Sequence, residues 1–401
     1  MQSQDWEVAI IGGGPAGLST ALFLAHAAPE LTDRIVVLEK ERYPRDKICG
    51  GAIGARGDKL LASIGVEVDV PSVQVAELAL RTSFGEAAAR VPHLGRVVRR
   101  VEFDHALARS AQRRGIRIIE GAQIEQLEVS HGAVQLDGTA GRFRARVAIG
   151  ADGVGGFVRR AMGLSAGRFR AQVIELDTEP VASDRARDSL RFDFFDPAFT
   201  GYAWDFPTLV DGKPLVCRGI YHLKLDDTKH DIAALLAQRL ARLGLSIADY
   251  QIKRFAERGF ETRQSFARPH VALVGEAAGI DGFSGEGIPQ AIEYGAFAGR
   301  YLAEKLRTGD LSFRDWDKRL AKAKPGYDLV MREGLMQRYY TGRRELFDRY
   351  YTALPGFVQC TAEQLAGLPI SNLLFLREAA GASLRALGDK LMPRLGRTSR
   401  S

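Results

Sequence analysis

Cysteine is scarce in this 401-residue chain, and its three cysteines stand far apart, at positions 49, 217 and 360. An odd, widely spaced set does not support a disulfide framework and lacks the close pairs of a zinc site. The seven histidines form no ligand constellation either; His93, His222 and His230 are scattered, as is usual for surface or core residues. We therefore expect no metal site and a reducing, cytoplasmic compartment.

Long hydrophobic runs are also missing. Nowhere do about 18 consecutive apolar residues occur without a charge, which is what a helix needs to cross a bilayer. The first seven residues include no cationic region ahead of an apolar stretch, so we expect no secretory signal. These absences predict a protein that is in solution or lies peripherally on a membrane.

The charge balance is only slightly uneven, with 56 Lys and Arg against 49 Asp and Glu. Residues 301–401 hold 18 basic and 11 acidic residues, which accounts for the whole net charge of +7 and leaves residues 1–300 neutral. Nucleic-acid binding is therefore not expected. The basic end also has apolar residues at helical spacing, although Gly381 and Gly388 weaken the helix. The stripe comprises Leu376, Ala380, Leu384, Leu387 and Leu391, with Arg377, Arg385 and Lys390 between them. We expect it to pack either on the protein's own core or on an anionic membrane.

Length and composition indicate a large globular protein. Hydrophobic residues make up 46% of the chain and charged residues 26%, which leaves ample material for a buried core. At roughly 150 residues per domain, the length predicts two to three domains.

A nucleotide-binding fingerprint starts at residue 8. The β-branched run 8–11 leads into Gly12-Gly13-Gly14-Pro15-Ala16-Gly17, and a helix-forming stretch follows to residue 26. Gly12 permits the tight turn, Gly14 lets the backbone approach a pyrophosphate, and Gly17 allows close packing of helix and strand. Phosphates then lie against the free N–H groups and positive dipole end of the helix.

Later segments extend this pattern. After an expected loop at 27–33, a strand at 34–38 ends at Glu39, which is placed to accept hydrogen bonds from a ribose diol. A strand at 144–151 leads into Asp152-Gly153, a strand at 270–274 leads into a turn from Gly275 to Gly279, and a helix is predicted over 288–306. Because NAD and FAD share the front end, these later turns decide between them.

The motifs resemble, in order and spacing, those of FAD-dependent oxidoreductases with the para-hydroxybenzoate hydroxylase fold. The resemblance covers roughly residues 6–306 and includes the Arg100-x-x-Phe103-Asp104 segment expected before a helix. Within that fold, three further strings are similar to the geranylgeranyl reductase family. They are Pro44-Arg45-Asp46-Lys47-Ile48-Cys49-Gly50-Gly51, Tyr202-Ala203-Trp204-Asp205-Phe206-Pro207 and Gly285-Glu286-Gly287-Ile288.

The resemblance implies an α/β fold in which a Rossmann-type FAD-binding domain carries an inserted antiparallel β-sheet substrate domain and a helical C-terminal extension. The FAD-binding domain is expected over 1–71, 98–165 and 267–306, and the substrate domain over 72–97 and 166–266, which reads as strand-rich and helix-poor. The helical region is expected over 307–401. The residues implied to bind FAD are Gly12, Gly14, Pro15, Ala16, Gly17, Glu39, Arg45, Lys47, Cys49, Gly50, Arg100, Asp152, Gly153, Gly275, Glu276, Gly285, Gly287 and Ile288.

Two departures from the family pattern concern the flavin. The family has Asp where this chain has Glu276, and that Asp contacts the ribityl chain. Glutamate keeps the acceptor and adds one methylene, so either the backbone shifts or the contact is lost and flavin affinity falls. The stretch Asp281-Gly282-Phe283 also lacks the usual proline.

Three features bear on chemistry. Gly285-Glu286-Gly287, which opens a helix, offers N–H donors where negative charge develops on a reduced flavin. Tyr202, Trp204 and Phe206 share one strand face, which by itself is an ordinary half-buried pattern. The resemblance assigns these three residues and Pro207 to the substrate pocket. Its π-faces suit a polyprenyl chain and positive charge on an alkene carbon.

Cys49 precedes two glycines, so we expect it on an uncrowded loop. Most free cysteines are small buried thiols, but the resemblance implies that this one lies near the flavin. It would deliver a proton opposite the flavin hydride, and Tyr202 and Trp204 complete the catalytic set. The nearby Arg45 and Lys47 are expected to lower the thiol pKa, which would oppose that role.

The leading functional hypothesis is a flavin-dependent reductase that saturates C=C bonds of an isoprenoid-like or other apolar or lipid substrate. No second glycine fingerprint is present, so the electron donor is external: NAD(P)H, ferredoxin or a flavin reductase. One alternative is a monooxygenase or halogenase that tailors a natural product. Against it, hydroxylases of the fold carry His where this chain has Gly279, and halogenases carry Trp-x-Trp-x-Ile-Pro at residues 202–207. A second alternative, motivated by Glu276, is a redox-sensing flavoprotein without turnover.

Overall fold

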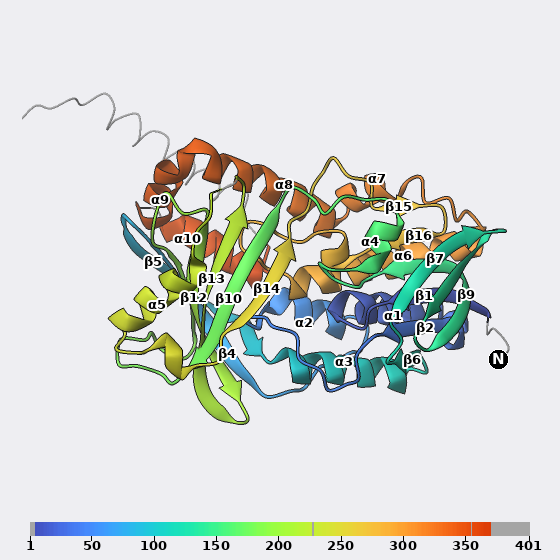
Figure 1. Cartoon of the computed structure of the whole chain (residues 1–401), viewed down its shortest axis with the longest axis horizontal. Helices are drawn as coiled ribbons and strands as arrows, with labels where there is room; N and C mark the ends of the chain where they lie inside the picture. Colours follow the sequence, from blue (N-terminus) through green and yellow to red (C-terminus); the bar gives the residue numbers. More distant parts are fainter. Residues whose placement is uncertain (1–4, 227, 354, 370–401) are drawn as a thin grey trace, which may run out of the picture.

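The structure is a computed structural model that describes residues 5–226, 228–353 and 355–369. Two sheets lie side by side along an elongated molecule, with most of the helices between and above them (Figure 1). The apolar stripe at 376–391 lies outside the described residues, so its prediction is untested.

The first sheet has a parallel centre, and its strands run in the order β15-β16-β9-β1-β2-β6. Its central strands are apolar and buried on both faces, as is typical of parallel sheets covered by helices. Strands β7 and β8 extend it beyond β9 as an antiparallel hairpin. The bounds are β1 (Asp5–Ile11), β2 (Ile35–Glu39), β6 (Arg117–Glu120), β7 (Ile124–Ser130), β8 (Ala133–Gly138), β9 (Gly141–Gly150), β15 (Ala267–Arg268) and β16 (Val271–Leu273).

Helices α1 (Pro15–Ala27) and α6 (Ile288–Thr308) pack closely against each other beside this sheet. A Cβ built on Gly295 would lie 2.4 Å from the Ser19 Cβ, and one on Gly299 2.5 Å from the Leu24 nitrogen, so both glycines are needed for this approach. The other elements here are α2 (Ala55–Ala62), α3 (Arg100–Arg113), α4 (Phe157–Ala161) and the 3₁₀ turns η1 (Pro29–Arg34) and η3 (Gly275–Ala277). The loop expected at 27–33 is thus partly a 3₁₀ turn, and Arg100 starts α3 rather than preceding it.

The second sheet is largely antiparallel, in the order β14-β10-β13-β12-β11-β4-β5-β3, with one parallel pair between β11 and β4. Its short strand β3 comes from the segment expected to belong to the FAD-binding domain, so the division into residue ranges stays a prediction. The bounds are β3 (Ala52–Gly54), β4 (Ser72–Thr82), β5 (Gly85–Val98), β10 (Arg170–Thr178), β11 (Ser189–Phe194), β12 (Gly201–Val210), β13 (Lys213–Lys224) and β14 (Lys253–Arg258).

The two faces of the second sheet have different neighbours, which positions the site. Side chains of Ala203, Ile174 and Ile220 face α5 (Ile232–Arg242) and, with its apolar residues, form a separate small core next to η2 (Ile247–Asp249). Helix α5 was not expected in a segment read as helix-poor. The opposite, inner face of the sheet carries Tyr202 and Trp204 and packs against the C-terminal helices.

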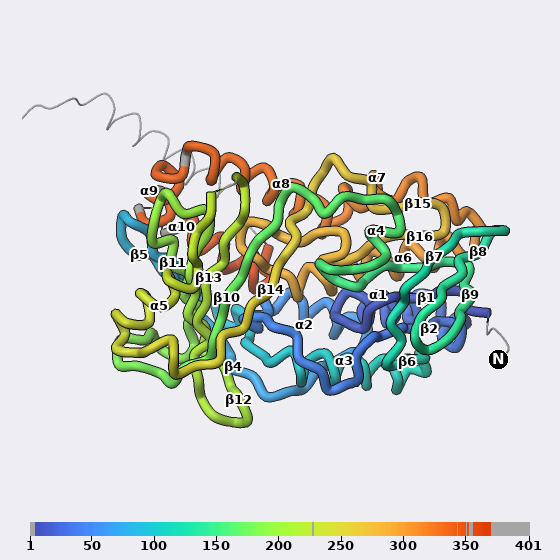
Figure 2. Tube along the Cα trace, viewed as in Figure 1, coloured from blue at the N-terminus to red at the C-terminus, as the bar shows by residue number. Residues whose placement is uncertain are grey.

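The chain continues through α7 (Trp316–Lys322), α8 (Lys324–Arg338), a π turn η4 (Tyr339–Arg343), α9 (Arg344–Ala353) and α10 (Pro355–Leu365). These elements run along the upper edge of the molecule in orange and red, as the tube in Figure 2 shows. Tyr339, Tyr351 and Val358 join the core of the inner sheet face. The predicted fold class is thereby confirmed, including its helical C-terminal part.

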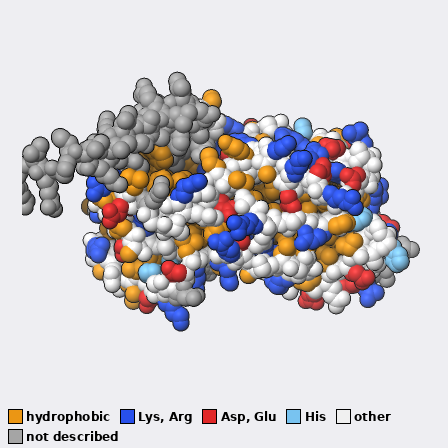
Figure 3. All heavy atoms as spheres, turned by 90° about the horizontal axis from the view of Figure 1, so that it is seen from above, with side chains coloured by type: hydrophobic (Ala, Val, Ile, Leu, Met, Phe, Trp, Pro, Cys, Tyr) orange, Lys and Arg blue, Asp and Glu red, His pale blue; other side chains and the backbone are white. Residues whose placement is uncertain are grey.

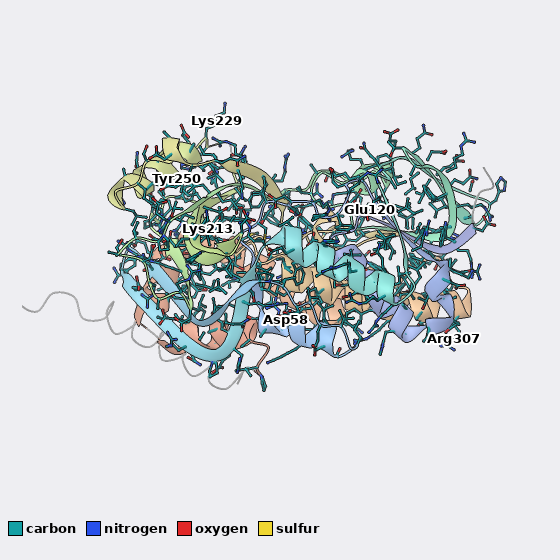
Figure 4. All side chains as sticks on the ribbon, turned by 90° about the horizontal axis from the view of Figure 1, so that it is seen from below. Asp58, Glu120, Lys213, Lys229, Tyr250 and Arg307 are labelled. Carbon is teal, nitrogen blue, oxygen red and sulfur yellow. The ribbon has the colours of Figure 1, made fainter. Side chains whose placement is uncertain are left out.

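The two halves are linked by ionic contacts. Arg96 of β5 donates to both carboxylate oxygens of Asp58 in α2, at 2.8 and 2.9 Å. Figure 4 labels Asp58 near the middle of the molecule, with Lys213 and Tyr250 on the half built from the second sheet and Glu120 on the other half. Within the described ranges, no helix has the length and apolarity needed to cross a bilayer.

Candidate active site

The glycine turn at the end of β1 has the geometry that the fingerprint predicts. Gly12 has a φ of +109°, and a Cβ there would lie 2.4 Å from the Ala151 oxygen; one on Gly17 would lie 1.9 Å from the Gly12 oxygen. Around Gly14, at the N-cap of α1, the nearest atom to such a Cβ is the Arg100 Nη2, 3.8 Å away. Gly12 and Gly17 therefore allow close packing, and Gly14 leaves open space before helix α1.

The next turn fits against this one. Pro15 is the first residue of α1, and a Cβ on Gly275, whose φ is +58°, would lie 2.5 Å from the Ala16 Cβ. The parallel strands β9 and β16 thus bring their turns to the same edge as the glycine fingerprint, where open α/β sheets bind ligands.

Glu39 is buried and heavily used by the protein itself. Its Oε2 accepts hydrogen bonds from the Gly13 nitrogen at 2.8 Å and from Arg45 at 3.1 Å, and its Oε1 accepts one from the Glu41 nitrogen at 3.0 Å. A carboxylate has about four acceptor positions, so roughly one remains for a ribose hydroxyl. Glu39 therefore holds the glycine turn, and its predicted contact with a ribose would use the remaining position.

Two guanidinium groups lie beside this turn because Asp104 fixes both. Arg100 binds the Asp104 carboxylate with two hydrogen bonds of 2.6 and 2.7 Å, and Arg45 binds it at 2.9 Å. Burial alone would lower the pKa of Arg100, but the charge of Asp104 overrides it and raises the pKa above its usual range. With the N-terminus of α1, these cations form an anion site suited to a pyrophosphate.

Lys47 and Glu276 form an ion pair of 2.8 Å, although only Glu276 is well shielded from solvent. Burial alone would lower the pKa of Lys47, but Glu276 and its hydrogen bond raise it. The second oxygen of Glu276, Oε1, is buried and has no hydrogen-bond partner among the described residues. A free buried acceptor at this edge fits a hydroxyl donor such as a ribityl chain.

The Asp152-Gly153 turn lies next to Glu276. A Cβ on Gly153, whose φ is +76°, would be 3.8 Å from the Glu276 Oε2. The Asp152 side chain itself accepts a hydrogen bond of 2.9 Å from the Val158 nitrogen and so holds the start of α4. Its other oxygen, Oδ1, is buried and, like Oε1 of Glu276, has no hydrogen-bond partner among the described residues, so the assignment of Asp152 to the cofactor stays a prediction.

Cys49 is half-buried on the loop of residues 40–51, and its sulfur accepts a hydrogen bond from the Gly51 nitrogen at 3.4 Å. Burial raises the thiol pKa; Arg100 lowers it, Glu175 raises it, and Lys47 lowers it more weakly. Lys47 thus acts in the expected direction, but burial outweighs it and the thiol pKa is raised overall; Arg45 is directed to the carboxylates of Asp104 and Glu39 instead. Cys49 is a neutral thiol near pH 7, which suits a proton donor.

The aromatic wall of β12 faces the Cys49 loop. A Cβ on Gly50 would lie 3.1 Å from the Trp204 Nε1 and 3.2 Å from the Phe206 ring, so this glycine lets the loop rest on the wall. Tyr202 stacks on Tyr221, with ring centres 5.1 Å apart. Pro207 has the opposite strand parity and lines a surface hollow with Asp205 and Val216 on the other face. Its assignment to the substrate pocket is therefore wrong.

The loop at 281–287 is held from two sides. On one side, the Tyr202 hydroxyl donates to the Ser284 oxygen, and the Tyr221 hydroxyl donates to the Gly282 oxygen at 3.0 Å. On the other, Arg332 of α8 binds Asp281 at 2.5 Å and lies 3.5 Å from Glu286.

The same loop leads directly into a helix. Gly285 has a φ of +66°, Gly287 is the N-cap of α6, and Ile288 is its buried first residue. The N–H groups that open α6 are thus presented by a braced loop, even without the usual proline.

Sequence analysis missed several residues that the fold brings here: Arg56, Glu175, Tyr221, Glu257 and Arg332. Glu257 has a side-chain oxygen 3.1 Å from a Cβ built on Gly285, and burial raises its pKa well above the usual range. Arg56 binds Glu286 at 2.6 Å. The sequence indicates a site role only for Glu175, which is a charged residue at an inward position of the apolar strand β10.

Comparison with known proteins agrees with this geometry. The sequence profile of a family described as an FAD binding domain matches residues 5–193. Digeranylgeranylglycerophospholipid reductase 2 of Methanosphaera stadtmanae is 25% identical over 327 residues, which cover 77% of this chain and 80% of that protein. A geranylgeranyl bacteriochlorophyll reductase-like structure from Thermoplasma acidophilum superposes with a TM-score of 0.68 at 18% identity and covers 97% of this chain and 99% of its own.

The chain is an FAD-dependent oxidoreductase that is similar to the geranylgeranyl reductases.

The fold of this flavoenzyme is shared more widely. A flavin-dependent brominase superposes with a TM-score of 0.68 at 16% identity and covers 97% of this chain and 100% of its own. At such identity the likeness shows the fold alone. FAD is the cofactor, and the open space at Gly14, the paired arginines and the free Glu276 oxygen fit it. The hypothesis of a flavoprotein without turnover is not retained.

Proposed function

We propose that this flavoenzyme reduces C=C bonds of an isoprenoid-like apolar substrate, with Cys49 as the proton donor. The observation that carries the proposal is the contact of the Cys49 loop with the aromatic wall, where Gly50 rests on Trp204 and Phe206. When bound and reduced, FAD supplies the hydride. Cys49, held neutral by burial, supplies the proton at the second carbon.

We further propose that FAD is held by the residues predicted from the sequence, with Asp152 also holding the start of α4. Arg45 and Arg100 lie at the phosphate end, Glu276 and Lys47 at the ribityl side, and the N–H groups of residues 285–287 at the ring. The donors at the N-terminus of α6 stabilise negative charge on the reduced ring. Tyr202 and Trp204 exclude water and hold the hydrocarbon.

The runner-up is an oxygen-using monooxygenase or halogenase, because enzymes of these classes share the fold. Gly279 makes it less suitable. A Cβ on Gly279, whose φ is +130°, would lie 2.7 Å from the Phe260 Cα, so the histidine that hydroxylases carry here does not fit this backbone.

The electron donor is proposed to be external, and a lipid substrate suggests contact with an anionic membrane. Helix α8 exposes Tyr327, Val330 and Met331 at 62%, 39% and 49%. They follow helical spacing on one face, and the basic residues Lys318, Lys322 and Lys324 lie in or next to α7, just before this face. Figure 3, which looks onto the molecule from above, shows hydrophobic side chains interspersed with Lys and Arg.

The proposed function is tested with a Cys49→Ala variant. We expect flavin content and dithionite reduction to be unchanged, and turnover of a geranylgeranylated lipid to fall by about 10²-fold, the usual contribution of a positioned acid. Unchanged turnover in C49A would remove Cys49 from the mechanism, and no turnover in the parent enzyme would remove the function.

A further inference from the structure

A buried carboxyl group lies on the inner face of the second sheet, behind the aromatic wall. Glu175 of β10 is 1% exposed, and its Oε2 has no hydrogen-bond partner in the part of the chain that the structure describes. Leaving an acceptor of a buried carboxylate unpaired is destabilising, and a protonated carboxyl largely avoids this penalty. Such a group in a native site calls for a functional explanation.

The strand register places Glu175 in one row with Trp204. Trp204 pairs with Gly219, and Gly219 pairs with Glu175, so the three residues share a face across β12, β13 and β10. A Cβ on Gly219 would lie 2.2 Å from the Trp204 ring. The indole thus extends over the glycine toward the carboxyl, and Glu175 borders the wall directly.

Cys49 is the other neighbour of Glu175. The backbone N–H of Cys49 lowers the pKa of the Glu175 carboxyl, and the charge of Glu175 raises the pKa of the Cys49 thiol. The thiol therefore responds to the charge of Glu175, and the carboxyl responds to the Cys49 backbone. The thiol and the carboxyl belong to segments that the fold alone brings together, a loop after β2 and a strand 126 positions later in the chain.

The surroundings set the protonation of Glu175. Burial raises its pKa to about 7; Lys253 lowers it, Asp177 raises it, and Arg99 and the Cys49 N–H lower it. Lys253 faces it from β14 by direct pairing, and Cys217 faces it from β13. Glu257 is also close enough to be affected by its charge. A carboxyl of this kind exchanges its proton near neutral pH.

We propose that Glu175 is the proton reservoir that reloads Cys49. The inference rests on the proposed function for its catalytic meaning. In the reduction, a hydride adds to one alkene carbon, the Cys49 S–H proton goes to the other, and a thiolate remains. Glu175–COOH then returns a proton to the thiolate and becomes a carboxylate, which solvent reprotonates. Two electrons come from the reduced flavin and one proton from water, so the step balances.

The first test measures the Cys49 thiol in the full-length holoprotein and needs no turnover. Iodoacetamide labelling of the Cys49 peptide is followed by mass spectrometry as a function of pH. In Glu175→Gln, the carboxylate that opposes thiolate formation is gone, so we expect the thiol pKa to fall by about one unit. Asp177→Asn is the matched control. Asp177 lies on the same strand face as Glu175, but its carboxylate is paired with Arg99 and Lys253. This variant leaves the Cys49 profile unchanged.

The second test is the pH profile of turnover. Because the protonated carboxyl is the active form, the parent activity falls as pH rises through about 7. In Glu175→Gln, we expect turnover to be about 10²-fold slower and no longer to fall as pH rises through about 7. Glu175→Asp should restore part of the turnover rate and part of this pH dependence. Flavin content and circular dichroism show that each variant is folded.

The outcomes separate this inference from the proposed function. An unchanged labelling profile in E175Q, or a retained fall in turnover near pH 7, overturns the reservoir role even if the enzyme reduces alkenes. A shifted labelling profile in a protein that reduces no alkene supports control of the thiol by Glu175 and rejects the proposed function.

Discussion

Lys47 donates a hydrogen bond of 2.8 Å to Glu276 and so joins two loops that are 229 positions apart. The longer side chain of glutamate reaches the lysine and still keeps its second oxygen buried and free among the described residues. The departure from the family's aspartate is thus compatible with flavin binding. It couples the loop of Cys49 to the loop that faces the ribityl chain.

This pairing predicts a graded effect on FAD affinity. Glu276→Ala removes the acceptor of a charge-assisted hydrogen bond, worth about 1.5–3 kcal/mol, so we expect the FAD dissociation constant to rise about tenfold or more. Lys47→Met should raise it only a few-fold, because Lys47 is partly exposed to solvent. Fluorescence titration of the apoprotein measures both. Lys40→Met, at an exposed lysine, is the control; equal effects of all three variants would contradict the assignment.

Asp104 is predicted to be essential for the phosphate end of the site. It is fully buried and binds both Arg45 and Arg100, so Asp104→Asn leaves two shielded cations poorly paired. Breaking such a buried arrangement costs about 3–5 kcal/mol. Urea unfolding should show this loss, together with weaker FAD binding. Asp137→Asn, which removes an exposed pair with Arg142, should cost no more than about 1 kcal/mol.

A third prediction concerns the contact between the Cys49 loop and the wall. Gly50→Ala introduces a methyl group 3.1 Å from the Trp204 Nε1, so the loop or the two rings of the wall must shift slightly. We expect a stability loss of about 1–3 kcal/mol and a larger relative loss of kcat/KM, with FAD content retained. Gly155→Ala is the matched control, because nothing lies within 4 Å of its added Cβ. Full activity in G50A would show that the contact is dispensable.

Membrane contact is predicted to depend on the exposed face of α8. Replacing Tyr327, Val330 and Met331 by serine should reduce co-sedimentation with anionic liposomes severalfold, since these side chains are exposed at 62%, 39% and 49%. Neutral liposomes control for charge. Deleting residues 371–401 separates this face from the terminal stripe. Unchanged binding in both variants would contradict a membrane role for this part of the protein.

Much of the fold could be predicted from local sequence. The Gly12–Gly17 turn, the strand that ends at Glu39 and the alternation of Tyr202, Trp204 and Phe206 each rest on patterns within a few residues. Helix α5 was missed although its apolar residues follow helical spacing, because the strands around it dominated the interpretation.

The partners within the site could not be predicted in the same way. The pKa of Cys49 is set mainly by burial, Arg100 and Glu175, and only weakly by its sequence neighbour Lys47. Arg332 reaches Asp281 across 51 positions, which no periodicity records. Pro207 follows Phe206 directly, so the alternation of a strand places it on the face opposite the aromatic wall and outside the predicted pocket.

The central claim is that the reduced flavoenzyme adds two hydrogens to a C=C bond. The direct measurement is anaerobic incubation of the dithionite-reduced holoprotein with geranylgeranylated lipids, followed by mass spectrometry of the product. The account predicts a product heavier than the substrate by two hydrogens per reduced bond, formed without oxygen and formed about 10²-fold more slowly in C49A. A product that forms only with O₂ and carries one added oxygen would contradict it.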